Sequence, residues 1–295
     1  MNQEFDFVVN CCGETRPNIP EEEIRMRAID PVVNCIEVVK TWKSFKKWVE
    51  VSTAQVYDSD NSASTEATPM KDLKPWTYAA QCRLEAEKLV RGSGLPHVVV
   101  RPAIVYGPAD TMGIMPRLCC AAVYQKLGET MTFMWTEKLK INTVHVKDVA
   151  KALYYVATKP TSGYNTFNLA DRCNFDQGKL NAIISKLFGI KTDFLGTIKS
   201  HLARLSLKSA CDAANEAHMP VWSGLLKDHG ILNTPLSTYI SLELLYNNSL
   251  CVDGTYICTV LDFQYDHPEC NEAEIRDMIN YAAQQGILPD GLLKN

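Results

Sequence analysis

The sequence has no long hydrophobic run. No segment approaches the roughly 18 apolar residues that a membrane-spanning helix needs. The first residues, MNQEFDFVVN, contain neither a basic leader nor a long apolar segment. We therefore expect a cytoplasmic protein without a membrane partner.

The sequence also lacks Cys and His residues at the spacing that is typical of metal sites. The chain has 11 cysteines, but no C-x-x-C pair and no cluster of His and Cys at zinc-like spacing. Several cysteines lie in apolar runs, as Cys11 and Cys12 do in FVVNCC. Because cysteine packs readily as a small hydrophobic residue, the sequence predicts reduced thiols and no metal site.

Basic residues are not in excess. The chain has 30 Lys and Arg against 34 Asp and Glu, a formal net charge of −4, and the cations are scattered. Nucleic-acid binding requires a basic patch or stripe, so we exclude it. The 46% of hydrophobic and 22% of charged residues are typical of a globular protein.

Short β-branched runs alternate with amphipathic stretches in the first half of the chain. Strands are expected at residues 5–12, 48–52 and 97–101, and helices at residues 21–42 and 76–90. Pro31 is expected to start, kink or divide the first of these helices. Strands and helices continue to alternate up to about residue 172, and helical segments dominate after about residue 174. This alternation predicts an α/β fold with a parallel sheet.

Four stretches carry a resemblance to a known family: DFVVNCCGET, VEVSTAQVY, VVVRPAIVYGPAD and NTVHVKDVAKAL, in that order. Together they resemble the extended short-chain dehydrogenase/reductase superfamily, which includes NAD-dependent nucleotide-sugar epimerases and dehydratases. The resemblance implies an incomplete Rossmann-like, doubly wound parallel sheet over residues 1–172. It also implies a smaller, mainly helical part over residues 173–295, similar to a substrate domain, and NAD or NADP as cofactor.

The resemblance assigns positions near that cofactor. They are the turn after the family's fourth strand, the hydroxyl that hydrogen-bonds the reacting oxygen, and the turn after the sixth strand. In this sequence the turn after the fourth strand contains Asn10, Cys11 and Gly13, and the hydroxyl is that of Thr53. The turn after the sixth strand contains Pro102, Ala103 and Val105. His145 and Asp148 match a shared strand-to-helix junction, where we expect structural roles: Asp148 as an N-cap and His145 within a strand.

The family's G-x-x-G-x-x-G turn, which in the family holds the pyrophosphate of the cofactor, is not found among the 15 glycines. We therefore expect the binding of NAD or NADP to this chain to be impaired. The first recognisable strand, residues 5–12, matches the family's fourth strand, so we expect an N-terminal part to be missing. In the family the first strand lies beside the fourth, which would leave residues 5–12 at a sheet edge. We expect another segment, a protein partner or a second copy of the chain to cover that edge.

The family's catalytic pair is a tyrosine and a lysine four residues apart on one helix. The lysine lowers the pKa of the tyrosine, which acts as general acid and base, and it holds the nicotinamide ribose. Four residues after Tyr78 stands Cys82. The glutamate that follows the family's lysine matches Glu87, which instead puts Arg83 in the lysine's place and Ala79 in the tyrosine's place. Neither register gives a complete pair.

Two functions remain open. The first is a catalytically impaired or non-catalytic member of the superfamily that acts as a binding or scaffold protein. The second is an active NAD(P)-dependent epimerase, dehydratase or reductase on a nucleotide-sugar-like substrate, whose N-terminal part is absent from this chain. Thr53, Tyr78, Arg83 and Tyr106 are its candidate residues. Cysteine chemistry at Cys82 is disfavoured because no histidine partner is identified.

Overall fold

We analysed a computed structural model of the chain, which describes residues 4–14, 16, 19–161 and 163–294. The chain forms two compact units and passes between them several times. Unit 1 consists of Met1–Ala103, Asn142–Arg172 and Leu250–Pro268, and unit 2 of Ile104–Ile141, Cys173–Ser249 and Glu269–Asn295.

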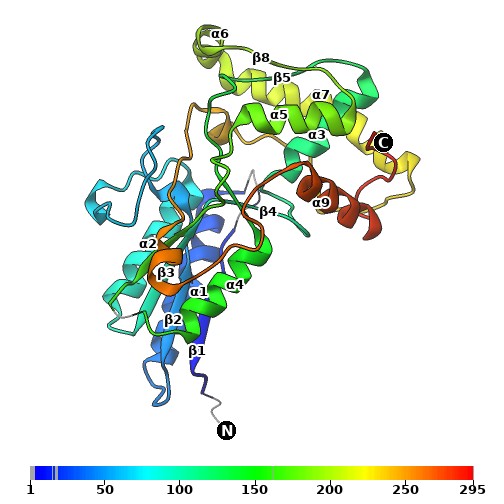
Figure 1. Cartoon of the computed structure of the whole chain (residues 1–295). Coiled ribbons are helices and arrows are strands. Elements are labelled where there is room, and N and C mark those ends of the chain that lie inside the picture. Colours follow the sequence, from blue (N-terminus) through cyan, green and yellow to red (C-terminus); the bar gives the residue numbers. More distant parts are fainter. Residues whose placement is uncertain (1–3, 15, 17–18, 162, 295) are drawn as a thin grey trace. The chain divides into compact units, whose positions relative to one another are not determined.

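Unit 1 is built on a parallel sheet in the order β1-β2-β3-β7 (Figure 1). The strands are β1 (Phe7–Asn10), β2 (Lys47–Val51), β3 (His97–Pro102) and β7 (Thr166–Leu169). The neighbours β1 and β2 are in parallel register, with Asn10 opposite Glu50. Among the described residues, β1 pairs with β2 alone, so it is an edge strand.

Helices cover both faces of this sheet. On one face, α1 (Glu21–Val39) and α2 (Tyr78–Gly92) pack together around Trp48. On the other face lies α4 (Val146–Thr158), where the Lys47 ammonium donates to the Val156 carbonyl at 2.8 Å. Neighbouring residues of a strand point to opposite faces, which accounts for this division. The parallel sheet with flanking helices confirms the predicted α/β class.

The predicted helix over residues 21–42 is a single helix that continues through Pro31. Its buried stripe, at helical spacing, holds it against the sheet face despite the lost backbone donor. That stripe contains Ala28, Ile29, Val32, Ile36 and Val39. Short elements complete unit 1: β6 (Thr143–His145), α8 (Tyr256–Leu261), η1 (Ala54–Val56) and η2 (Met70–Asp72).

One detail of the expected strand-to-helix junction was wrong. Helix α4 begins at Val146, and its N-cap is His145, whose Nδ1 accepts from the Lys147 amide at 3.3 Å. Asp148 is therefore in the first turn and not at the N-cap. Its buried carboxylate instead accepts from the backbone amides of Asp266 at 2.8 Å and His267 at 2.9 Å.

Unit 2 is mainly helical. Its helices are α3 (Met115–Leu127), α5 (Gln177–Phe188), α6 (Thr197–Ala203), α7 (Leu207–Asp228) and α9 (Glu272–Gln284). Its strands are β4 (Ile104–Tyr106), β5 (Met131–Phe133) and β8 (Thr192–Phe194), and its short helices are η3 (Arg204–Ser206) and η4 (Leu242–Leu245). Strands β5 and β8 pair in parallel, and the unit's core forms between the helices.

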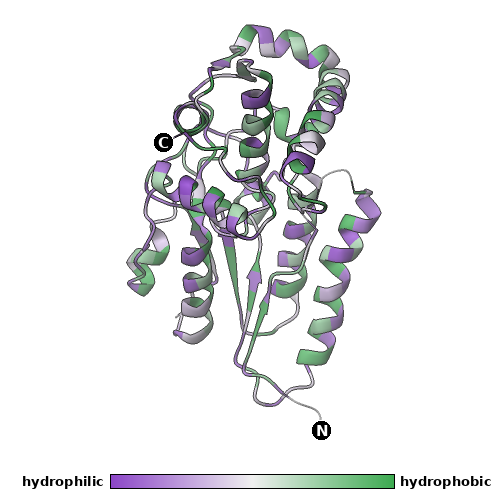
Figure 2. Ribbon diagram, turned by 90° about the vertical axis from the view of Figure 1, so that its right-hand side faces the viewer, coloured by the Kyte–Doolittle hydropathy of each residue, from purple (hydrophilic) through white to green (hydrophobic). Residues whose placement is uncertain are grey.

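Figure 2 shows the hydropathy of each residue along these elements. Hydrophilic and hydrophobic bands alternate along the helices, as expected for helices with one buried and one exposed face. Among the described residues, no helix combines the length and apolar character that crossing a bilayer requires.

Candidate functional site

The candidate site lies at the carboxyl ends of β1 and β2 in unit 1. Asn10, the last residue of β1, donates from Nδ2 to both carboxylate oxygens of Glu50, at 2.9 and 2.8 Å. Its Oδ1 accepts from the Cys12 amide at 3.0 Å. Asn10 therefore joins the two strands through its side chain and stiffens the turn that follows β1.

Glu50 was not among the residues predicted from the sequence. It is fully buried and also accepts from the Trp48 indole Nε1 at 2.8 Å. Burial raises the pKa of its carboxyl to about 7, although the hydrogen bonds from Asn10 and Trp48 and the charge of Arg83 act in the opposite direction. The available signal was an acidic residue in the middle of the otherwise apolar strand WVEV.

Arg83 connects the same two strand ends from helix α2. Its NH1 donates to the carbonyl oxygens of Val51, at 3.1 Å, and of Cys12. Gly13 lies directly under the guanidinium, because a Cβ added there would be 2.5 Å from the Arg83 Cζ. The φ of Gly13 is +150°, which other residues rarely adopt. Burial lowers the pKa of Arg83, while the charge of Glu50 opposes that shift.

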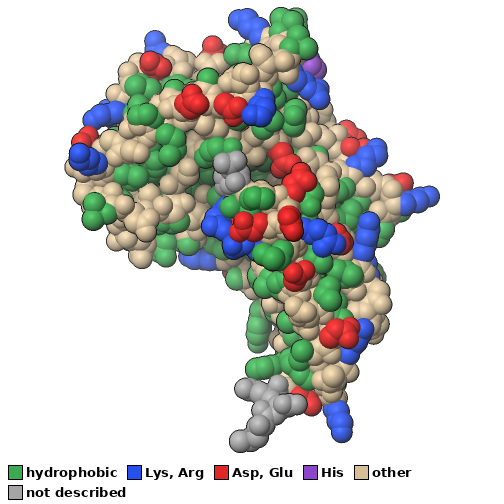
Figure 3. Space-filling view, turned by 180° about the vertical axis from the view of Figure 1, so that it is seen from behind, with side chains coloured by type: hydrophobic (Ala, Val, Ile, Leu, Met, Phe, Trp, Pro, Cys, Tyr) green, Lys and Arg blue, Asp and Glu red, His purple; other side chains and the backbone are tan. Residues whose placement is uncertain are grey.

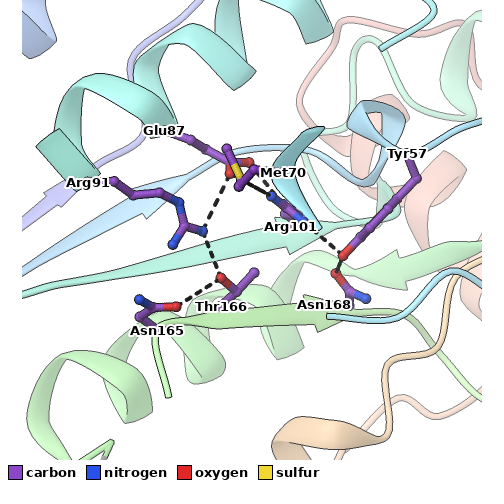
Figure 4. Close-up of polar contacts among 8 residues, drawn as sticks. All are labelled: Tyr57, Met70, Glu87, Arg91, Arg101, Asn165, Thr166 and Asn168. Carbon is purple, nitrogen blue, oxygen red and sulfur yellow. Dashed lines mark hydrogen bonds and ion pairs between the residues drawn. The ribbon is translucent and has the colours of Figure 1, made fainter. Parts of the chain in front are cut away.

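A buried ion pair determines how α2 is rotated (Figure 4). Glu87 accepts from the Arg101 Nε at 2.9 Å and NH2 at 2.7 Å, and both side chains are almost completely buried. Positions 83 and 87 are four residues apart, so they share one face of the helix. With Glu87 held against β3, Arg83 is directed to the ends of β1 and β2.

The ion pair belongs to a larger polar network across the sheet. Arg101 also donates to the Tyr57 hydroxyl at 3.0 Å, which in turn donates to Asn168 Oδ1 on β7 at 2.8 Å. Arg91 reaches β7 as well, through a hydrogen bond to Thr166 Oγ1 at 2.7 Å (Figure 4). Burial raises the pKa of Tyr57. The bonds among its members indicate a structural role, although Arg91 Nε and Asn168 Nδ2 are buried without a hydrogen-bond partner among the described residues.

Tyr78 does not share the environment of Arg83. It packs against the apolar cluster between α1 and α2, which also contains Cys82. The pKa of Tyr78 is raised by burial and by the nearby Cys82 and Glu21. A separation of five residues corresponds to about 140° around a helix, so Tyr78 and Arg83 lie on different faces of α2.

The hydroxyl groups of Ser52 and Thr53, just after β2, differ in their hydrogen bonds. Thr53 Oγ1 accepts from the Gln55 amide at 3.2 Å and so caps η1. The adjacent Ser52 is buried, and its Oγ has no hydrogen-bond partner among the described residues. A buried polar group without a partner is costly, so Ser52 marks a position where a ligand could bind.

The other predicted cofactor positions are distributed between the two units. Pro102 and Ala103 end β3, where Pro102 is paired with Leu169 and the Ala103 amide donates to the Leu169 carbonyl at 2.8 Å. Cys11 is exposed in the turn after β1. Val105 lies on β4 of unit 2, as does Tyr106, whose hydroxyl donates to the Glu269 carbonyl at 3.4 Å.

The arrangement fits a ligand that carries hydroxyl or anionic groups. Among the described residues, Arg83 uses only NH1 for its backbone contacts, which leaves Nε and NH2 available as donors. A guanidinium is well suited to bind a ribose or phosphate oxygen, and the Ser52 hydroxyl can accept or donate a hydrogen bond. Among the described residues of unit 1, Arg83 and Ser52 are therefore candidates for holding a cofactor.

Comparisons with known proteins agree with this fold. The sequence model of the family described as "NAD dependent epimerase/dehydratase family" matches residues 1–170. No curated protein matches the sequence.

Three solved structures show the similarity, all at low sequence identity. Pal from Bacillus thuringiensis has a TM-score of 0.64 and 15% identity, covering 96% of this chain and 78% of that one. UDP-glucuronic acid 4-epimerase from Bacillus cereus, in complex with UDP-glucuronic acid and NAD, has a TM-score of 0.64 and 13% identity, with 95% and 76% covered. UDP-N-acetylglucosamine 4-epimerase from Methanobrevibacter ruminantium M1 has a TM-score of 0.63 and 17% identity, with 95% and 77% covered.

Proposed function

The chain belongs to the NAD dependent epimerase/dehydratase family, and from this premise we propose that it is a catalytically impaired member that acts as a binding protein. Its ligand, in this proposal, is an NAD(P)-type nucleotide, held at the ends of β1 and β2. The observation that carries the proposal is the rotation of α2. The helix directs a cation towards these strand ends and has no tyrosine at the matching position.

The family's acid and base chemistry depends on a hydroxyl and a cation four residues apart. The cation at this site is Arg83, and four residues before it stands Ala79. Tyr78 lies in the α1–α2 cluster, where its pKa is raised, whereas an acid or base needs a pKa near the working pH. Without a positioned hydroxyl of suitable pKa, proton transfer to and from a substrate is not supported.

Nucleotide binding requires hydrogen-bond donors at the site but no group that transfers a proton. Arg83 would donate to a ribose hydroxyl or a phosphate oxygen, and Ser52 would add a hydrogen bond. Asn10 and Glu50 would hold the turn that carries Cys12, whose carbonyl keeps Arg83 in place. A bound nicotinamide would supply a hydride acceptor, but the proposal assigns these residues to binding alone.

Titration calorimetry with NAD(H) and NADP(H), combined with turnover assays on UDP-sugars, tests the proposal. We expect measurable nucleotide binding that falls at least about 10-fold in Arg83→Ala, because one charge-assisted hydrogen bond contributes roughly that much. We expect no turnover by the wild type, and unchanged nucleotide affinity in Tyr78→Phe.

A gain-of-function variant sharpens the test. Ala79→Tyr combined with Arg83→Lys restores a hydroxyl and an ammonium four residues apart on the correct face of α2. Turnover in this variant alone would support impairment through the lost pair. Turnover in the wild type that disappears in Tyr78→Phe would contradict the proposal.

The alternative is an active NAD(P)-dependent enzyme on a nucleotide-sugar-like substrate. Buried Ser52, with its unpartnered hydroxyl beside Thr53, favours it, because a hydroxyl at this strand end could bind a reacting oxygen. Its signature would be wild-type turnover that is lost in Ser52→Ala or Thr53→Ala.

A further inference from the structure

A stripe of large apolar side chains faces outward on α6 and η3 of unit 2. Ile198, Leu202 and Leu205 are 79%, 64% and 90% exposed. Their spacing of four and then three residues places them on one side of a continuous helical segment. Single exposed apolar residues are common, but three along one side of a helix indicate an interaction surface.

The opposite side of α6 is attached to the rest of unit 2. Ser200 is fully buried, and its Oγ accepts from the Trp135 amide at 2.8 Å. At the border of the stripe, the ring of the exposed His201 meets the Trp135 ring edge-on, with centroids 5.2 Å apart. Leu207, directly after η3, is buried. These contacts fix the rotation of the helix, so the apolar stripe stays on the outside.

The stripe is bordered by positive charge. Residues 197–208 contain Lys199, Arg204 and Lys208 but no Asp or Glu, although the whole chain has a net charge of −4. Lys199 follows Ile198 on α6, at about 100° from it around the helix, and Lys208 lies near the start of α7, three residues after Leu205. Hydrophobic side chains lie next to Lys and Arg side chains at the level of α6, at the top of Figure 3.

Lys199, Arg204 and Lys208 differ in the contacts that they make with other residues of the chain. Lys199 is exposed and has no ion-pair or hydrogen-bond partner among the described residues. Arg204 lies over the Tyr246 ring, 5.4 Å from its centroid, and Lys208 forms an exposed ion pair with Asp212 at 2.9 Å. Exposed ion pairs contribute little, so Lys208 can exchange Asp212 for another anion at small cost.

We propose that this face of α6 and η3 binds an anionic lipid surface. An outward apolar stripe with adjoining cations, and with no Asp or Glu in residues 197–208, fits a helix that lies in the membrane interface, with apolar side chains at the acyl boundary and cations at the headgroups. The expectation of no membrane partner was based on the lack of a spanning segment, which surface binding does not require. The proposal is independent of the nucleotide site.

Vesicle flotation of the full chain tests it, with phosphatidylcholine vesicles that contain or lack phosphatidylserine. We expect the wild type to float with the anionic vesicles only. Ile198→Ser combined with Leu205→Ser should weaken partitioning about 100-fold or more, since two large apolar side chains no longer leave water. Lys199→Gln combined with Lys208→Gln should weaken it about 10-fold on anionic vesicles.

Leu232→Ser is the matched control. Leu232 is 99% exposed in unit 2 but lies outside the stripe, so its replacement should leave flotation unchanged. All the substituted residues are exposed, and thermal unfolding should show that each variant keeps the wild-type midpoint within a few degrees.

Three results would overturn the proposal: a wild type that does not float, flotation that is independent of phosphatidylserine, or an Ile198/Leu205 variant that floats like the wild type. A fourth is a wild-type dimer that becomes monomeric in Leu205→Ser, because the stripe would then bind a second copy of the chain.

Discussion

Glu50 is a fully buried carboxylate at the end of β2. Burial raises the pKa of its carboxyl from 4.5 to about 7, so the folded protein binds its proton more tightly than the unfolded chain. The resulting stabilisation is fully present below pH 4.5 and is lost as the pH rises through 7. Between pH 5 and 8 we expect the free energy of unfolding to fall by on the order of 2–3 kcal/mol from this group.

Urea denaturation at several pH values measures this dependence. Glu50→Gln cannot ionise, so its stability curve should lack the decrease, whereas Glu129→Gln, at an exposed position, should follow the wild type. Parallel curves for Glu50→Gln and the wild type would show that Glu50 titrates normally.

The close approach of Gly13 to the Arg83 guanidinium gives a second prediction about single residues. A Cβ on Gly13 would come within 2.5 Å of the Arg83 Cζ, so Gly13→Ala should displace the guanidinium from the Val51 and Cys12 carbonyls. We expect a loss of about 1–2 kcal/mol in unfolding free energy. In an Arg83→Ala background the same substitution should cost clearly less, and a double-mutant cycle by denaturation measures that coupling. Strict additivity would mean that the two residues do not interact.

At the scale of elements, the Glu87–Arg101 pair determines where α2 places Arg83. Glu87→Ala would leave the buried Arg101 without its partner, and we expect a loss of about 3–5 kcal/mol in unfolding free energy. Glu85→Ala is the control on the same helix, because Glu85 and Arg25 form a half-exposed pair that contributes at most about 1 kcal/mol. Equal losses in the two variants, measured by chemical denaturation, would contradict this role for Glu87.

Much of the α/β fold could be predicted from periodicity, because the β-branched runs and the helical stripes are local patterns. The match of Glu87 in LEAEKLV to the family's glutamate placed Arg83 at the family's lysine position, and in the structure Arg83 contacts the carbonyls at the ends of β1 and β2. Glu50 was missed because nothing local shows that Asn10 and Trp48 surround it. The stripe of Ile198, Leu202 and Leu205 was missed for a related reason: helical spacing shows that a face is apolar, but only tertiary packing shows that it is outside.

At the scale of the whole molecule, the open edge of β1 is the feature that bears on association. Strand β1 pairs with β2 alone among the described residues, and Val9 and Phe5 are 44% and 50% exposed. An edge with free backbone groups and exposed apolar side chains is a template for a further strand. We propose that a protein strand covers it, and that a second copy of the chain can do so.

Light scattering after size exclusion, over a range of concentrations, tests this association. We expect a concentration-dependent dimer that Val9→Lys shifts towards monomer about 10-fold or more, because a charge on an edge strand opposes pairing with another strand. Val38→Lys is a control, since Val38 is 54% exposed on α1, outside the sheet edge. A dimer that responds to Leu205→Ser and not to Val9→Lys would place the contact on the α6 face, and a monomer at every concentration would leave a different protein as the partner of β1.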